Sequence, residues 1–233
     1  DVQIPGSVAC TVQGLPTFCG VVSNAGKAKF KGLEFEGRAR LGQDMAAAGD
    51  RLTLSTAIGF IDADYKEYIS NIGGRPTDVA DFREVQNTPK WTASGTLAYS
   101  APVGDGDISF STTVSYRSKT YQFEIPNPYI DQKGFALWDA SLVYTAPDDR
   151  WSIGVFGKNL LDKQYKTSGY TFMVANPTTG ALVQTTAPTP VAACPGMAPL
   201  PTGSLIPALG CEGVLTAFYG NPRQVFVTGT VKF

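Results

Sequence analysis

The stretch Gly106–Arg117, GDISFSTTVSYR, decides the fold class because its residues alternate in polarity from beginning to end. The even positions from Ile108 to Tyr116 are mostly apolar, and the odd positions from Ser109 to Arg117 are all polar. Successive side chains of a β-strand point to opposite faces, so this period of two predicts a long strand with one apolar and one polar face.

The same alternation recurs in six further segments, which predicts seven long strands in all. These segments are Lys27–Leu41, Arg51–Tyr65, Trp91–Ser100, Phe135–Thr145, Trp151–Leu160 and Val225–Phe233. The sequence therefore predicts an all-β protein.

The connections between these strands alternate between short and long. Residues 42–50, 101–107 and 146–150 are rich in turn-forming residues, whereas 66–89, 118–134 and 161–222 are long. Short turns at one end and long loops at the other are typical of an antiparallel outer-membrane β-barrel, with the short turns in the periplasm. A soluble β-sandwich is the alternative, but its strands are commonly shorter and its loops show no such asymmetry.

Aromatic residues near both ends of the strands also favour a bacterial outer membrane. Trp91 and Tyr99 lie on the apolar face of one strand, separated by roughly 20 Å of membrane height. Aromatic belts at the two membrane surfaces have this arrangement. No apolar run approaches the ~18 residues of a transmembrane helix. The net charge of −1 gives no electrostatic reason to expect a nucleic-acid partner.

Four cysteines form two local pairs, Cys10 with Cys19 and Cys194 with Cys211. The chain has no histidine and neither pair is a CxxC, so a zinc site of the usual kind is hard to assemble. We expect two disulfides that close short loops, with free thiols as the alternative, and hence an oxidising compartment.

The last strand ends on Phe233, and an alternating strand with a terminal aromatic resembles the signal read by the barrel assembly machinery. Residues 1–26 are then an extracellular loop, residues 161–222 a second one, and 223–233 the closing strand. Bacterial single-chain barrels have an even number of strands. We therefore expect the C-terminal portion of a larger barrel. An autonomous eight-stranded barrel is the alternative if part of 1–26 forms another strand.

Four segments together resemble the TonB-dependent outer-membrane receptors. They are KAKFKGLEFEGRARL (27–41), NTPKWTASGTLAYS (87–100), GKNLLDKQYKTSGY (157–170) and GNPRQVFVTGTVKF (220–233). The resemblance spans about 27–170 and 218–233. It implies a barrel of about 22 strands filled by an N-terminal plug domain. Residues 1–233 would supply its last seven strands, and the plug and the TonB box would lie outside this chain.

The candidate site residues fall into two groups. Glu34, Glu36, Arg38 and Arg40 alternate along one strand, so we expect them on the lumen wall, as a contact for plug or solute or as a solvated, mutually compensating ladder. The outer loops supply the expected ligand contacts, because aromatic and arginine side chains suit a solute site. These loop residues are Arg75, Arg83, Tyr121, Phe123, Tyr129, Tyr170 and Phe172.

No catalytic or metal-binding set of residues emerges from the sequence. Without histidine a Ser-His-Asp or Cys-His arrangement is impossible. Asp62 and Asp64 could offer oxygen ligands to calcium, but nothing completes the six or more donors that calcium takes, so they read as solvated strand tips. We therefore expect no enzymatic activity and no cofactor.

The predicted function is active uptake of a scarce solute across the outer membrane, coupled to TonB, with an iron–siderophore as the commonest cargo in the family. The predicted partners are the rest of the barrel, the plug, the TonB complex, the barrel assembly machinery, outer-membrane lipid and lipopolysaccharide, and a small solute. A passive porin or an adhesion barrel is the alternative function.

Overall fold

The chain folds into antiparallel β-sheet in a computed structural model that describes residues 2–12, 15–188, 198–208 and 215–232. The strands are β1 (Val2–Val12), β2 (Leu15–Gln43), β3 (Arg51–Ile72), β4 (Arg75–Asp78), β5 (Trp91–Val103), β6 (Gly106–Arg117), β7 (Phe135–Thr145), β8 (Trp151–Lys158), β9 (Lys166–Thr171), β10 (Leu215–Tyr219) and β11 (Gln224–Val231). Two short 3₁₀ turns, η1 (Ala80–Phe82) and η2 (Pro147–Asp149), interrupt the connections. Within the described ranges no helix is long and apolar enough to cross a membrane.

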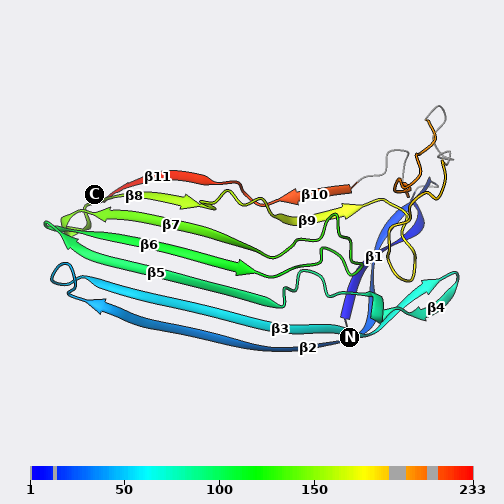
Figure 1. The fold of residues 1–233 in the computed structure, drawn as a ribbon, viewed down its shortest axis with the longest axis horizontal. Helices are drawn as coiled ribbons and strands as arrows, with labels where there is room; N and C mark the ends of the chain where they lie inside the picture. Colours follow the sequence, from blue (N-terminus) through cyan, green and yellow to red (C-terminus); the bar gives the residue numbers. More distant parts are fainter. Residues whose placement is uncertain (1, 13–14, 189–197, 209–214, 233) are drawn as a thin grey trace.

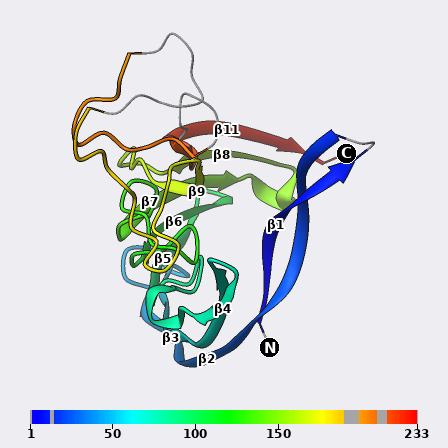
Figure 2. The same ribbon diagram turned by 90° about the vertical axis from the view of Figure 1, so that its right-hand side faces the viewer.

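One large sheet contains nine of these strands, in the order β1-β2-β3-β5-β6-β7-β8-β11 with β4 paired to β3. Figure 1 shows the strands running side by side, with the tight turns and the C-terminus at one end and the long connections at the other. Seen along the strands, the sheet curves into a trough, and β1 with the first part of β2 rises along its open side (Figure 2). The described strands do not join β1 to β11, so the sheet is an open part of a β-barrel wall.

Each of the seven predicted strands is present, which confirms the predicted antiparallel barrel architecture. β6 and β7 have the predicted bounds, and β2 and β3 extend beyond them at the end of the long connections. The alternation locates these strands well because the two faces of a barrel wall meet different surroundings. In a barrel wall every second side chain faces the other side, so polarity changes at each residue.

Residues 1–26, expected as an extracellular loop, contain paired strands, as the alternative prediction of a further strand there allowed. β1 pairs with the start of β2 in a hairpin, from Val12 opposite Leu15 to Val2 opposite Gly26. Likewise β9 and β10 pair inside the predicted 161–222 loop, and β4 folds back on the end of β3. The extracellular position of these segments remains a prediction.

The turn between β2 and β3 shows how the short connections are fixed. Asp50 is buried, and its carboxylate accepts hydrogen bonds from the backbone N–H groups of Met45, Ala46 and Ala47 at 2.7–3.1 Å. The Tyr99 hydroxyl donates to the same carboxylate at 2.9 Å. These bonds, chiefly those from the Ala46 and Met45 N–H groups, lower the pKa of Asp50 to about 2. One carboxylate therefore closes the turn and ties it to β5.

Candidate functional site

A hollow of about 500 Å³ lies on the polar face of the sheet, near the strand ends that lead into the long connections. The ladder register aligns one residue from each of five adjacent strands across it. This row is Glu34, Gly59, Thr92, Arg117 and Phe135. The next row toward the short turns is Glu36, Ala57, Ser94, Ser115 and Leu137. Strand alternation therefore places these ten positions on one face.

Small side chains in the middle of these rows leave the space of the hollow open. Gly59, Ala57 and Ser94 occupy its floor, whereas carboxylates stand at the β2 side and Arg117 stands at the β6 side. A Cβ atom added at Gly59 would approach the Thr92 hydroxyl to 2.8 Å. A side chain at Gly59 would thus meet Thr92, and larger residues on the floor would reduce the volume of the hollow.

The turn of residues 159–165 supplies the aromatic wall of the hollow. Tyr165 stacks on Phe135 with ring centroids 4.6 Å apart and an angle of 18° between the planes. Gly220 lies directly against the Tyr165 ring, and its N–H donates to the Tyr165 carbonyl at 2.9 Å. A side chain at Gly220 would overlap that ring, so the segment before β11 holds Tyr165 in place.

Asn159 holds this turn together. It is buried with a φ of 49°, and its Nδ2 donates to the carbonyls of Lys163 and Asn221, both at 3.0 Å. Its Oδ1 accepts the Lys163 N–H at 2.8 Å. The Asn159 N–H in turn donates to the carboxylate of Asp139 at 2.8 Å. The chain after β8 is therefore fixed both to β7 and to the segment that enters β11.

Charged groups of both signs face the space. Glu34, Glu36 and Arg117 line the larger hollow, and Glu36 with Arg38 lines an adjoining one of about 460 Å³. In the described chain no direct ion pair joins Glu34 or Glu36 to Arg38 or Arg40, and both expected roles, a contact for plug or solute and a solvated ladder, stay predictions. These charges are exposed to water and available to a polar solute or to another protein segment.

Arg40 lies apart from this group. Its guanidinium donates to the Gln43 side chain at 2.9 Å, toward the short β2–β3 turn, and it lines neither hollow. Three of the four predicted wall residues thus border the open space.

Arg83, predicted as a loop contact for ligand, is buried among the connections. Its guanidinium donates to the carbonyls of Thr178 at 3.0 Å and Pro177 at 3.3 Å. It also lies over the Tyr68 ring at 5.5 Å. This geometry gives Arg83 a structural role, because its donors join the 79–90 segment to the last long connection. Arg75, at the start of β4, is exposed.

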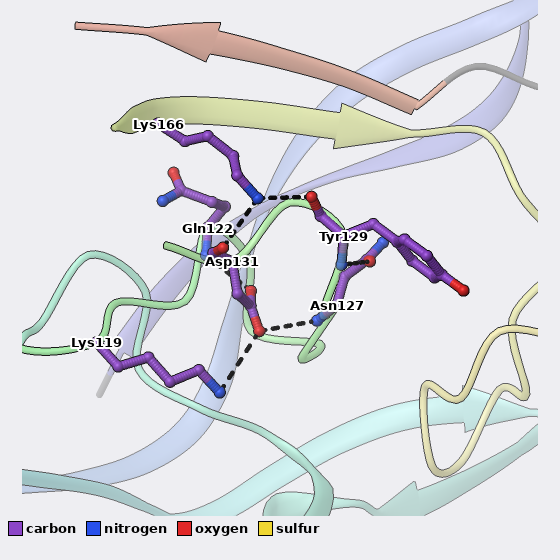
Figure 3. A network of polar contacts seen from close by, with 6 residues as sticks. All are labelled: Lys119, Gln122, Asn127, Tyr129, Asp131 and Lys166. Atoms are coloured by element: carbon purple, nitrogen blue, oxygen red, sulfur yellow. Dashed lines mark hydrogen bonds and ion pairs between the residues drawn. The ribbon is translucent and has the colours of Figure 1, made fainter. Parts of the chain in front are cut away.

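The connection of residues 118–134 is organised around Asp131, as Figure 3 shows. The buried Asp131 carboxylate accepts the Asn127 N–H at 3.2 Å and lies 3.8 Å from the Lys119 ammonium. Burial raises the pKa of Asp131, against the opposing effect of these partners. Lys166, from β9, donates to the carbonyls of Tyr129 at 2.6 Å and Asp131 at 3.0 Å. The network holds this connection beneath β9.

The predicted aromatic residues of this connection lie in different environments. Tyr129 is exposed at the surface, and Phe123 is half-buried. Tyr121 is half-buried beneath Lys119, whose ammonium is 4.0 Å from the ring centroid. The structure does not bring the three rings together.

A separate aromatic cluster forms on the antiparallel pair of β9 and β10. The Tyr170 ring centroid lies 5.3 Å from that of Phe172 and 6.0 Å from that of Phe218. Gly169, on the opposite face of β9, packs on Ile130. The cluster therefore faces away from the 118–134 connection and remains exposed. The sequence did not identify Phe218, because no strand was predicted within the 161–222 loop that contains it.

Arg117 and Tyr165 were also missed as site residues. Arg117 ends the alternating polar face of β6, and Tyr165 closes the NLLDKQY motif, so both signals were present in the sequence. Their proximity depends on the β5–β6–β7 register and on the turn after β8, which the sequence alone did not supply.

Several predicted residues lie outside the part of the chain that is described. Cys194, Cys211 and Phe233 are outside it altogether, as are the side chains of Cys10 and Cys19. The backbone register places Cys10 opposite Thr17 and Cys19 opposite Val8, an offset of two positions. Both disulfides and the assembly signal remain predictions.

Asp62 and Asp64 form ion pairs with Lys90 at 3.2 Å and with Lys66 at 3.4 Å. Among the residues described, no group of three or more His, Cys, Asp or Glu side chains could hold a metal ion. Each aspartate thus has an ammonium partner at the end of the strand.

Comparison with known proteins agrees with this architecture. Residues 2–160 match the family model of the TonB dependent receptor-like β-barrel. The fold is similar to the crystal structure of the ferric yersiniabactin uptake receptor FyuA from Yersinia pestis, with a TM-score of 0.58 and 18% sequence identity. The match covers 91% of this chain and 25% of that one, so this chain spans about a quarter of the receptor's length.

Proposed function

Because this chain belongs to the TonB-dependent receptor-like β-barrel family of the bacterial outer membrane, we propose that it forms part of a TonB-coupled transporter for a scarce solute. Its polar face is then part of the lumen wall, and its long connections lie outside the cell. The family and the fold are those of transporters and receptors. The observation that carries the proposal is the hollow on the polar face, lined by Glu34, Glu36 and Arg117 directly beneath these connections.

An iron–siderophore is the cargo that we propose. The similar receptor from Yersinia pestis is described as taking up ferric yersiniabactin. The exposed Tyr170–Phe172–Phe218 cluster offers aromatic contact area at the surface, and the charged hollow lies on the polar face below. Aromatic groups give large contact area at low entropic cost, and this suits the first capture of a bulky organic complex.

The proposed partners follow from the same role. A plug domain would contact Glu34, Glu36 and Arg38 across the lumen, and TonB would act on that plug. Phe233 would be read by the barrel assembly machinery. Lipopolysaccharide would contact the apolar outer face. We also propose that the two cysteine pairs, Cys10 with Cys19 and Cys194 with Cys211, form disulfides outside the cell.

The test is uptake of radiolabelled iron by iron-limited cells that express the full-length protein, using a panel of siderophores. We expect accumulation of at least one complex that stops when TonB is deleted or the proton gradient is collapsed. Uptake that persists without TonB, together with a steady conductance in planar bilayers, would instead identify a passive porin. Absence of uptake for every siderophore, with TonB-dependent uptake of another nutrient, would refute the iron cargo alone.

A further inference from the structure

Eight charged side chains gather on the apolar face where the middle of β2 pairs with the second half of β3, and one of them, Lys90, comes from the segment before β5. Five are lysines, which we call the lysine belt: Lys27, Lys29, Lys31, Lys66 and Lys90. Three are acidic: Asp62, Asp64 and Glu67. The lysines therefore exceed the acids by two.

The register shows which face the belt occupies. Lys29 lies opposite Asp64, Lys31 opposite Asp62, and Leu33 opposite Phe60. Successive pairs are two residues apart on each strand, so all three pairs share one face. Leu33 is 78% exposed, and nearby Phe35 and Trp91 on the same face are exposed too. The charged belt thus directly continues the exposed apolar surface.

Two lysines of the belt have no ion-pair partner among the described residues. Lys27 pairs with Glu67 at 3.3 Å, while Asp64 and Asp62 pair with Lys66 and Lys90. In the described chain Lys29 and Lys31 have no ion pair, although each faces an aspartate across the ladder. Both side chains are exposed. The acids are already occupied by other lysines, so these two ammonium groups present unneutralised positive charge.

The spacing between the lysines and the neighbouring apolar surface suits a ligand with a charged headgroup and apolar chains. Lys31 and Leu33 are one pleat repeat apart, which is roughly 6.6 Å along the strand. Trp91 packs on Phe60 with centroids 4.7 Å apart, at the same level as Leu33. Aromatic residues commonly mark the level of the lipid headgroups. A lipid with its chains against Leu33 and Phe35 would bring its headgroup to Lys29 and Lys31.

We propose that the lysine belt binds the phosphate groups of a phosphorylated lipid in the outer leaflet. This inference rests on the outer-membrane placement in the proposed function, but not on the cargo. Ammonium groups are strong hydrogen-bond donors to phosphate, and basic residues at the membrane surface attract anionic lipid. The apolar surface next to the belt favours a lipid over free phosphate, because only the lipid can cover Leu33 and Phe35.

The test compares lipid binding by the full-length protein and by the double variant Lys29→Gln, Lys31→Gln in dodecyl maltoside. The probes are bisphosphorylated lipid A, non-phosphorylated lipid A and inorganic phosphate, with bound lipid counted by native mass spectrometry. Each lysine near an anionic lipid surface contributes about fivefold in affinity, so the double variant should bind bisphosphorylated lipid A about 25-fold more weakly. Binding of the non-phosphorylated lipid should be unchanged.

Three controls keep the outcome clear. Lys232→Gln removes a lysine near Asp149, at the opposite end of the strands, and should leave binding unchanged. The variant Lys29→Arg, Lys31→Arg should keep most of the affinity for bisphosphorylated lipid A. Heat-modifiable migration on gels checks that each barrel folds. If the double glutamine variant does not fold, the test is instead the binding of bisphosphorylated lipid A by the wild-type protein at rising salt concentration. Binding should weaken as the salt concentration rises, and binding independent of salt would overturn the proposal.

Equal affinity of the double variant for bisphosphorylated lipid A, or equal wild-type affinity for the two lipids, would overturn the proposal. Displacement of the lipid by micromolar inorganic phosphate would assign the belt to a soluble anion instead. Iron uptake is measured separately, so failure here leaves the transport proposal intact.

Discussion

Asn159 offers the sharpest test of how the aromatic wall of the hollow is built. Its side chain makes three hydrogen bonds, to the Lys163 N–H, the Lys163 carbonyl and the Asn221 carbonyl. Asn159→Ala removes all three, and a loss of about 1 kcal/mol for each gives about 3 kcal/mol. Alanine also tolerates the φ of 49° less well than asparagine, at about 1 kcal/mol more. We therefore expect the turn to lose about 4 kcal/mol of local stability.

The assay is amide hydrogen exchange of the full-length protein in detergent, read at Lys163 and in the peptide that contains Tyr165. A loss of about 4 kcal/mol predicts exchange faster by about three decades, unless global opening sets the limit first. Asn159→Gly removes the same bonds without the backbone cost, so it should recover about one of those decades. Asn71→Ala, at an exposed position of β3, is the matched control and should change nothing. Unchanged protection of Lys163 in folded Asn159→Ala would refute this account of the turn.

Three further predictions follow from single contacts. Gly220→Ala should displace the Tyr165 ring, because a Cβ atom there overlaps it, and solute affinity should fall about tenfold in a binding titration if the ring contacts solute. Asp50 has a lowered pKa, so its stabilisation of the β2–β3 turn should be complete above pH about 4 and lost as the pH falls toward about 2. Amide exchange of the turn should therefore become faster over this pH range, and Asp50→Asn should remove the pH dependence. A pH dependence that persists in Asp50→Asn would contradict the assignment. Arg83→Met should release residues 172–188, at a cost of about 2 kcal/mol, and speed their cleavage in limited proteolysis at least tenfold, whereas uniform cleavage rates would argue against the clamp.

The barrel strands could be predicted because a single physical cause shapes all seven. One face meets an apolar medium and the other a polar space, so each strand carries the same period of two. β6 and β7 are therefore located to the residue from sequence alone. The hairpin of β1 and β2 lacks this alternation, and the β1 sequence VQIPGSVACTV contains a proline and a glycine that weaken any strand prediction. Its pairing follows from the partner strand, which pattern reading along one segment does not reveal.

The candidate site was predicted less completely, because it is assembled between strands. The alternation placed Glu34, Glu36 and Arg38 on the polar face, where they border the hollows. It could not show that Arg117 stands three strands away in the row of Glu34, since that depends on the register of every intervening pair. Arg83 shows the opposite failure. Its residue type suits ligand binding, but the carbonyls of the last long connection take its donors.

Register is therefore the quantity on which both proposals depend. A slip of one residue between β2 and β3 would move Glu34 and Glu36 to the apolar face and bring Lys29 and Lys31 to the polar one. The hollow would lose its carboxylates, and the membrane surface would lose its excess lysines. The cost of exposing carboxylates to lipid opposes that slip, as does the cost of removing Leu33 and Phe35 from it. The same alternation that lets the strands lie in a membrane thus fixes the rows that form the hollow and the lysine belt.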